Sequence, residues 1–83
     1  MRKTIINKEV TVTAVGFKKN LAAYPRAIEF EGTTYDFVDQ GLSCVVRQGS
    51  RLSQILMLSD GPRQFRLRSD NSGGIWTLLS ISA

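Results

Sequence analysis

The side chains that most often carry chemistry are scarce in this 83-residue sequence. It contains no histidine, which removes the commonest general base, the usual partner of a nucleophilic serine or cysteine, and the commonest metal ligand. Cys44 is the single cysteine, so neither an internal disulfide nor an ordinary Cys/His zinc site can form. The sequence therefore predicts a protein that is not an enzyme.

The carboxylates do not group into a site either. Their spacing matches no calcium-binding loop, and Asp60 lies beside a turn glycine. The run Asn71-Ser72-Gly73-Gly74 lacks both the Lys-Ser/Thr end of a P-loop and the spacing of a dinucleotide-binding loop. We expect no metal, no cofactor and no small-molecule ligand. The seven carboxylates are Glu9, Glu29, Glu31, Asp36, Asp39, Asp60 and Asp70.

Positive charge is the remaining chemical signal. Eleven Lys and Arg against seven Asp and Glu give a net charge of +4, and every cation after residue 41 is an arginine. The planar guanidinium suits phosphates, so these arginines predict contacts with a nucleic-acid backbone. The alternative is that strand arginines protect sheet edges or pair with Glu29 and Asp36. The predicted nucleic-acid-binding residues are Arg47, Arg51, Arg66 and Arg68.

Turn signals divide the chain into short apolar runs rich in Val, Ile, Phe and Tyr. They predict one all-β domain over residues 1–83, an antiparallel meander of six or seven short strands. The sheet would form a closed or partly open barrel, similar in size to SH3 and OB barrels. The alternative is an open sheet whose second face is buried by dimerisation. At most one helical turn is expected, beginning at Asn20 and ending before Pro25.

The best-defined hairpin runs from residue 27 to residue 38. A two-residue loop at Gly32-Thr33 would place glycine where a type II′ turn requires it. Four apolar side chains then share one face, whereas Glu29 and Asp36 oppose each other on the other face. In this register Phe30 opposes Tyr35 and Ile28 opposes Phe37.

A second hairpin follows if residues 60–63 form a four-residue turn. Leu58 then opposes Phe65 and Leu56 opposes Leu67 on the core face. The reverse face would pair Met57 with Arg66 and Ile55 with Arg68. The loop around Gly49 has either two or three residues, and the two lengths turn opposite faces of residues 42–46 inward.

The run from Ile75 to Ile81 has apolar residues on both faces, as in a strand that is buried on both sides. One face would hold Trp76 and Leu78. The other face would lie on the same side of the sheet as Ile55 and Met57 of the second hairpin. This apolar surface would be covered either by Val10 and Val12 of the first strand or by another subunit. The predicted interface residues are Ile55, Met57, Ile75, Leu79 and Ile81.

Few aromatic residues remain for stacking on bases. The pattern assigns four rings to the core, and Phe17, Tyr24 and Trp76 remain as candidate platforms. Cys44 lies in an apolar run and is predicted to be a buried thiol, consistent with a reducing cytoplasm. No segment has the apolar length of a membrane span. The four core rings are Phe30, Tyr35, Phe37 and Phe65.

Two functions are compatible with these features, and both are non-enzymatic. The first is a nucleic-acid-binding module that uses the arginines of the C-terminal half. The second is a protein-interaction module, with another protein or a second copy of the chain as partner and no role in nucleic-acid binding.

Overall fold

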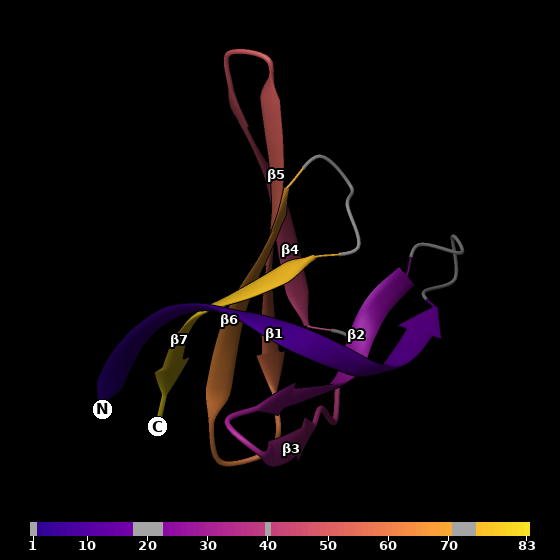
Figure 1. The fold of residues 1–83 in the computed structure, drawn as a ribbon, viewed down its shortest axis with the longest axis vertical. Coiled ribbons are helices and arrows are strands. Elements are labelled where there is room, and N and C mark those ends of the chain that lie inside the picture. Colours follow the sequence, from indigo (N-terminus) through magenta and orange to yellow (C-terminus); the bar gives the residue numbers. More distant parts are fainter. Residues whose placement is uncertain (1, 18–22, 40, 71–74) are drawn as a thin grey trace.

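Seven antiparallel strands form one sheet in the computed structural model, which describes residues 2–17, 23–39, 41–70 and 75–83 (Figure 1). Their order in the sheet is β3-β2-β1-β7-β6-β5-β4. This confirms the all-β fold of antiparallel strands, although the consecutive strands β3 and β4 lie at opposite edges of the sheet, and the sheet is not closed into a barrel. The strands are β1 (Lys3–Phe17), β2 (Ala23–Phe30), β3 (Thr33–Asp36), β4 (Leu42–Gln48), β5 (Arg51–Ser59), β6 (Gln64–Asp70) and β7 (Trp76–Ser82).

The long strand β1 joins the two halves of the sheet. Its first part pairs with β7 and its second part pairs with β2. Register shifts interrupt both ladders, and Asn7 at one of them has a positive φ of 55°. Such bulges bend a strand and increase its twist. The sheet therefore curls, so that β2 and β3 pack against β5 and β6.

The core lies inside this curl. Phe65 on β6 is fully buried, and the ring centroids of Tyr35 and Phe37 lie 5.0 and 5.2 Å from its own. Partly buried side chains, among them Phe30, pack against this centre. The assignment of these four rings to the core is confirmed. The buried cluster comprises Val10, Ile28, Phe37, Leu56, Leu58, Phe65, Leu67 and Leu78.

The connection from β3 to β4 closes one end of the curl. The Val38 N–H donates to the Ser59 carbonyl of β5 at 2.8 Å. Gly41, with a φ of +69°, passes so close to β5 that a Cβ atom there would collide with the Met57 carbonyl oxygen. Beyond this point the β4–β5 hairpin extends away from the rest of the sheet (Figure 1).

The register of β5 and β6 is as predicted. Leu58 pairs with Phe65 and Leu56 with Leu67 on the core face, across the four-residue turn. Asp60 stabilises that turn by accepting hydrogen bonds from the Arg63 backbone N–H at 2.9 Å and from its guanidinium at 2.7 and 3.0 Å.

The predicted register of β2 and β3 is wrong by two residues. Ile28 pairs with Tyr35, and the loop consists of Glu31 and Gly32, with φ values of 51° and 78°. Glu29 therefore pairs with Thr34 instead of Asp36. The β-branched Thr33 is better placed in a strand than in a turn, which favours this loop. Because the shift is an even number, the same four apolar side chains still face the core.

Two other expectations concern loops. The β4–β5 loop has two residues, since Gln48 pairs with Arg51, and Gly49 has a φ of 62°. The predicted helical turn beginning at Asn20 falls on residues 18–22, outside the described residues, and Pro25 belongs to β2. The described residues form no helix that could cross a membrane.

Candidate functional site on strands β4 to β6

Strands β4 and β5 present apolar side chains on the face opposite the core. The ladder places Leu42 beside Met57, and Cys44 beside Ile55. Val46 lies on the same face, next to Ser53. Leu42 is 76% exposed, whereas Ile55 and Met57 are half-buried. We call this face the outer face, and its apolar residues Leu42, Cys44, Val46, Ile55 and Met57 the outer patch.

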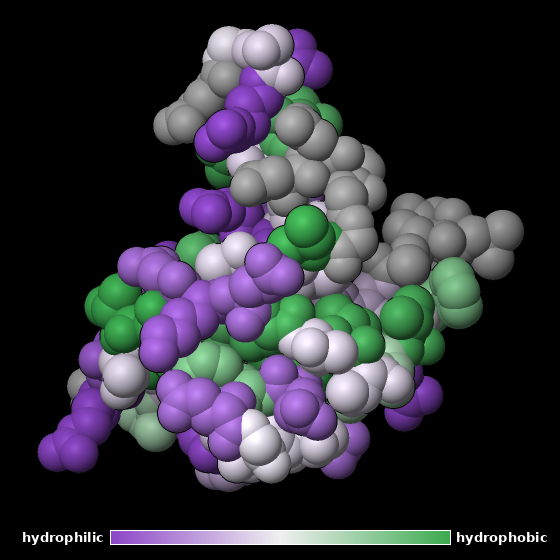
Figure 2. Space-filling view, viewed as in Figure 1, coloured by the Kyte–Doolittle hydropathy of each residue, from purple (hydrophilic) through white to green (hydrophobic). Residues whose placement is uncertain are grey.

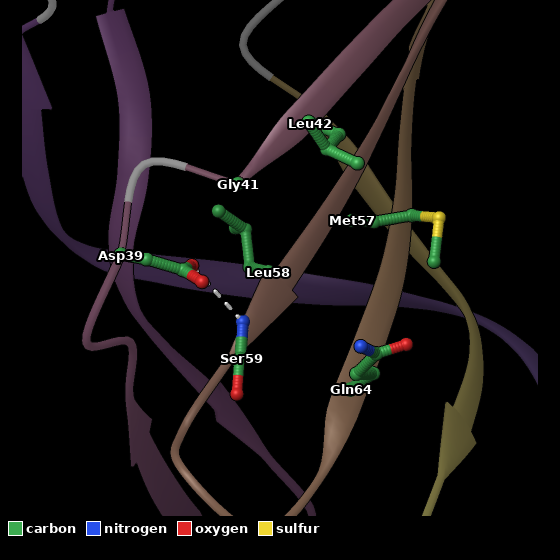
Figure 3. Close-up of a pocket in the computed structure, with 7 residues that line it drawn as sticks. All are labelled: Asp39, Gly41, Leu42, Met57, Leu58, Ser59 and Gln64. Carbon is green, nitrogen blue, oxygen red and sulfur yellow. Dashed lines mark hydrogen bonds between the residues drawn. The ribbon is translucent and has the colours of Figure 1, made fainter.

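Two shallow hollows meet at Leu42 and Met57. One has a volume of about 280 Å³ and is lined by Leu42, Ser43, Cys44, Ile55, Met57 and Arg66. The other has a volume of about 380 Å³ and extends toward the β3–β4 connection (Figure 3). There the Asp39 carboxylate accepts a hydrogen bond of 3.3 Å from the Ser59 N–H. The two hollows make the surface of the outer patch uneven, and side chains of a partner could fill them.

Within the described part of the chain β4 pairs only with β5, so it forms an edge of the sheet. Both of its faces are exposed, including Val45, which is 64% exposed although it lies on the core side. The hairpin extends past the segments that cover the core, so nothing in the described residues buries Val45 (Figure 1). Figure 2 shows hydrophilic residues at the tip of this hairpin and exposed hydrophobic residues below them.

The backbone of β4 also has groups available for pairing. The two-residue loop makes Gln48 and Arg51 a hydrogen-bonded pair, and such pairs alternate along an antiparallel ladder. Every second residue of β4 therefore bonds to β5. Ser43, Val45 and Arg47, which lie between them, direct their N–H and C=O groups away from the sheet.

The predicted burial of Cys44 is wrong, because its thiol is free and exposed. The apolar run around Cys44 suggested a core strand. Since β4 is an edge strand on a protruding hairpin, apolar residues remain at the surface on both of its faces.

The arginines predicted to bind phosphates do not all lie together. Arg66 and Arg68 pair with Met57 and Ile55 as expected, so they lie on the outer face. Arg51 has the same orientation at the hairpin tip, whereas Arg47 pairs with Leu52 on the opposite face. A terminal guanidinium nitrogen of Arg66 lies 4.0 Å from the Met57 sulfur.

Sequence reasoning missed a further cation on this face. Lys3 of β1 pairs with Ser82 and lines a small hollow together with Arg66. It was missed because the pairing of the first strand with the last was not predicted in register. Arg63 has a different role, since its guanidinium lies on the core side, 5.0 Å from the Tyr35 ring centroid.

The predicted interface residues separate into two groups. Ile55 and Met57 lie on the outer face, but Ile81 pairs with Phe65 and packs against the core, so its predicted orientation is wrong. The cause is a bulge at Leu79, where the register with β6 shifts and the following residues change face. Ile75 is exposed just before β7.

The first strand does not cover the outer patch. Val10 is buried in the core cluster and Val12 packs against it, so the predicted cover by these two residues is wrong. Among the residues that the structure describes, none closes over Leu42 and Cys44.

No protein-family model, no curated protein and no solved structure matches this chain.

Other kinds of site find little support in the described ranges. There, no three His, Cys, Asp or Glu side chains lie close enough together to hold a metal ion. Of the candidate stacking rings, Tyr24 and Trp76 pack against the core, and Phe17 is exposed on β1, which is not one of the strands that carry the four predicted arginines.

Proposed function

We propose that this chain is a non-enzymatic binding module that accepts a polypeptide strand along the edge of β4. The observation that carries the proposal is the exposure of β4 on both faces, with apolar side chains and outward-directed backbone groups in one strand. An added strand would extend the sheet by main-chain hydrogen bonds, a common mode of peptide recognition.

The outer patch would supply specificity. Side chains of an added strand alternate between the two faces of the sheet, so every second one would lie beside Leu42, Cys44 and Val46. Residues of about the size of Val or Ile would reach the hollow between Leu42 and Met57. An apolar edge of this kind is otherwise a liability, because it invites uncontrolled pairing.

Val45 provides a sharp test. Its N–H points away from β5, so Val45→Pro removes an edge donor and leaves the β4–β5 ladder intact. A display library of random peptides of about eight residues, the length of such a strand, should yield binders rich in β-branched and aromatic residues. These peptides should bind the unmodified chain and Val45→Thr but not Val45→Pro. Equal binding to Val45→Pro would refute the proposed site.

A second candidate function is binding to a nucleic-acid backbone, favoured by the common face of Lys3, Arg51 and Arg66, all of which are exposed. Arg68 shares this face, and Arg47 does not. Three phosphate contacts predict a slope of about −2.7 for log K against log salt on duplex DNA. Fluorescence anisotropy at about 50 and 200 mM salt measures it, and a flat slope would exclude this function.

The proposed compartment is the cytoplasm. An exposed thiol such as Cys44 stays reduced there, whereas an oxidising compartment would favour disulfide formation. Fractionation of cells that produce the chain, with thiol labelling of each fraction, tests this assignment.

A further inference from the structure

We propose that the strand accepted by β4 is the β4 strand of a second copy, paired antiparallel about a two-fold axis that passes between the two Cys44 residues. This inference rests on the proposed function and names its partner. It predicts a continuous sheet that runs through both copies, with one outer face shared by the two outer patches.

The backbone of β4 fits this arrangement. When Cys44 lies opposite Cys44, Ser43 of each copy lies opposite Val45 of the other. Both residues direct their N–H and C=O groups outward, so they form hydrogen-bonded pairs, and the two cysteines form the non-hydrogen-bonded pair between them. The two-fold axis also keeps the outer faces of both copies on the same side, as a continuous pleat requires.

The side chains fit this register better than the neighbouring one. On the outer face, Leu42 of each copy meets Val46 of the other, on both sides of the cysteine pair. A shift that centres the axis on Val45 would instead place Leu42 opposite Gln48, and Ser43 opposite Arg47. The proposed register therefore pairs the apolar residues of the outer face of β4 with one another and leaves Arg47 outside the apolar centre.

Charge favours the antiparallel direction. Arg47 and Arg51 are the only charged residues between positions 42 and 59, and both lie at the hairpin tip. Asp39 lies near the other end of the hairpin and is exposed. Antiparallel pairing brings the basic tip of each copy toward Asp39 of the other, whereas parallel pairing would bring the two basic tips together.

Sedimentation equilibrium tests the pairing. Between about 5 and 500 µM, a range that brackets micromolar affinity, the apparent mass should rise from 9.2 kDa toward twice that value. Val45→Pro removes one edge donor from each copy and should raise the dissociation constant by about thirtyfold or more, whereas Val45→Thr should not. Circular dichroism and amide spectra of Val45→Pro establish that its own sheet is intact.

Cys44 reports the register. Diamide, an oxidant that accepts the two electrons and two protons released by a pair of thiols, should convert the unmodified chain to a disulfide-linked dimer. A non-hydrogen-bonded antiparallel pair has a Cα separation of about 4.5 Å, within the range of disulfides. The linked dimer should form much more slowly in Val45→Pro, although its thiol is equally exposed.

The outcomes separate the two proposals. A dimer that Val45→Pro abolishes and diamide links through Cys44 supports this inference. A dimer that persists in Val45→Pro, or one that diamide does not link, overturns it. A strict monomer also overturns it. In that case the displayed peptides decide about the proposed function: peptides that shift the Ser43 and Val45 amides of the unmodified chain would retain an edge that binds strands, and the absence of any such peptide would reject both proposals.

Discussion

Replacing Leu42 with alanine should cost the isolated chain little stability, whereas the same replacement at Leu56 should cost much more. Both leucines lie in the β4–β5 hairpin, so chemistry and strand context are matched. Leu56 is 0% exposed, and a Leu→Ala change at such a site costs about 2 to 5 kcal/mol. Leu42 is 76% exposed, so only a quarter of the burial energy of about 1.5 to 3 kcal/mol is lost, or about 0.4 to 0.8 kcal/mol.

Urea unfolding followed by the fluorescence of Trp76, the single tryptophan, measures both costs. The titrations should be repeated at low and high protein concentration. If β4 pairs with a second copy, the unfolding midpoint of the unmodified chain rises with concentration, because only the folded chain associates. The midpoint of Leu42→Ala should rise less, since this variant lacks the side chain that meets Val46 of the second copy.

One result would refute the reasoning behind the exposed edge. If Leu42→Ala cost as much as Leu56→Ala at every concentration, Leu42 would be covered by its own chain in solution. The outer patch would then belong to the core, and β4 would not be an open binding edge.

Three further predictions concern other positions, and the first two are measured by urea unfolding. Gly41→Ala should destabilise the fold more than Gly49→Ala: both glycines have positive φ, which costs other residues about 1 to 2 kcal/mol, but only at Gly41 would the new methyl group collide with β5. Asp60→Ala should cost about 1.5 to 3 kcal/mol, because the hydrogen bonds with Arg63 are lost from a partly buried turn; equal stability would show that they contribute nothing. Cys44 should react with a maleimide in the dilute folded chain as fast as in urea, and strong protection at low concentration would contradict its exposure.

The sequence was most informative where turn chemistry determined the register. A four-residue turn at residues 60–63 was one hypothesis for the second hairpin, and the apolar pattern on both sides of it agreed with the register that the structure shows. At the β2–β3 loop the prediction placed the turn at Gly32-Thr33, whereas the observed turn places Glu31 at a positive φ that pattern alone does not favour. The core was still predicted correctly there, because the error was an even number of residues.

Bulges and exposure were not predictable in the same way. A bulge at Leu79 moves Ile81 to the core face. The sequence does not reveal such a bulge, because one extra residue does not change the pattern of a run that is apolar at nearly every position. Cys44 was predicted to be buried because it lies in an apolar run. Composition does not reveal that the β4–β5 hairpin extends beyond the segments that could bury it. The outer patch could have been found if the two-residue loop at Gly49 had been chosen, since that loop alone aligns Leu42 and Cys44 with Met57 and Ile55.

The two edges of the sheet differ in a way that supports a binding role for β4. At one edge, β3 has only four residues, and the chain that follows it is tied to β5 by the hydrogen bond from Val38. At the other edge, the first five residues of β4 contain no proline, lysine or other charge, although these are the usual means of blocking edge pairing. A protein that protects one edge and leaves a longer, apolar edge open is expected to aggregate unless a defined partner covers it. Pairing of β4 with a second copy would meet this requirement, since each edge would cover the other and leave neither available to a further chain.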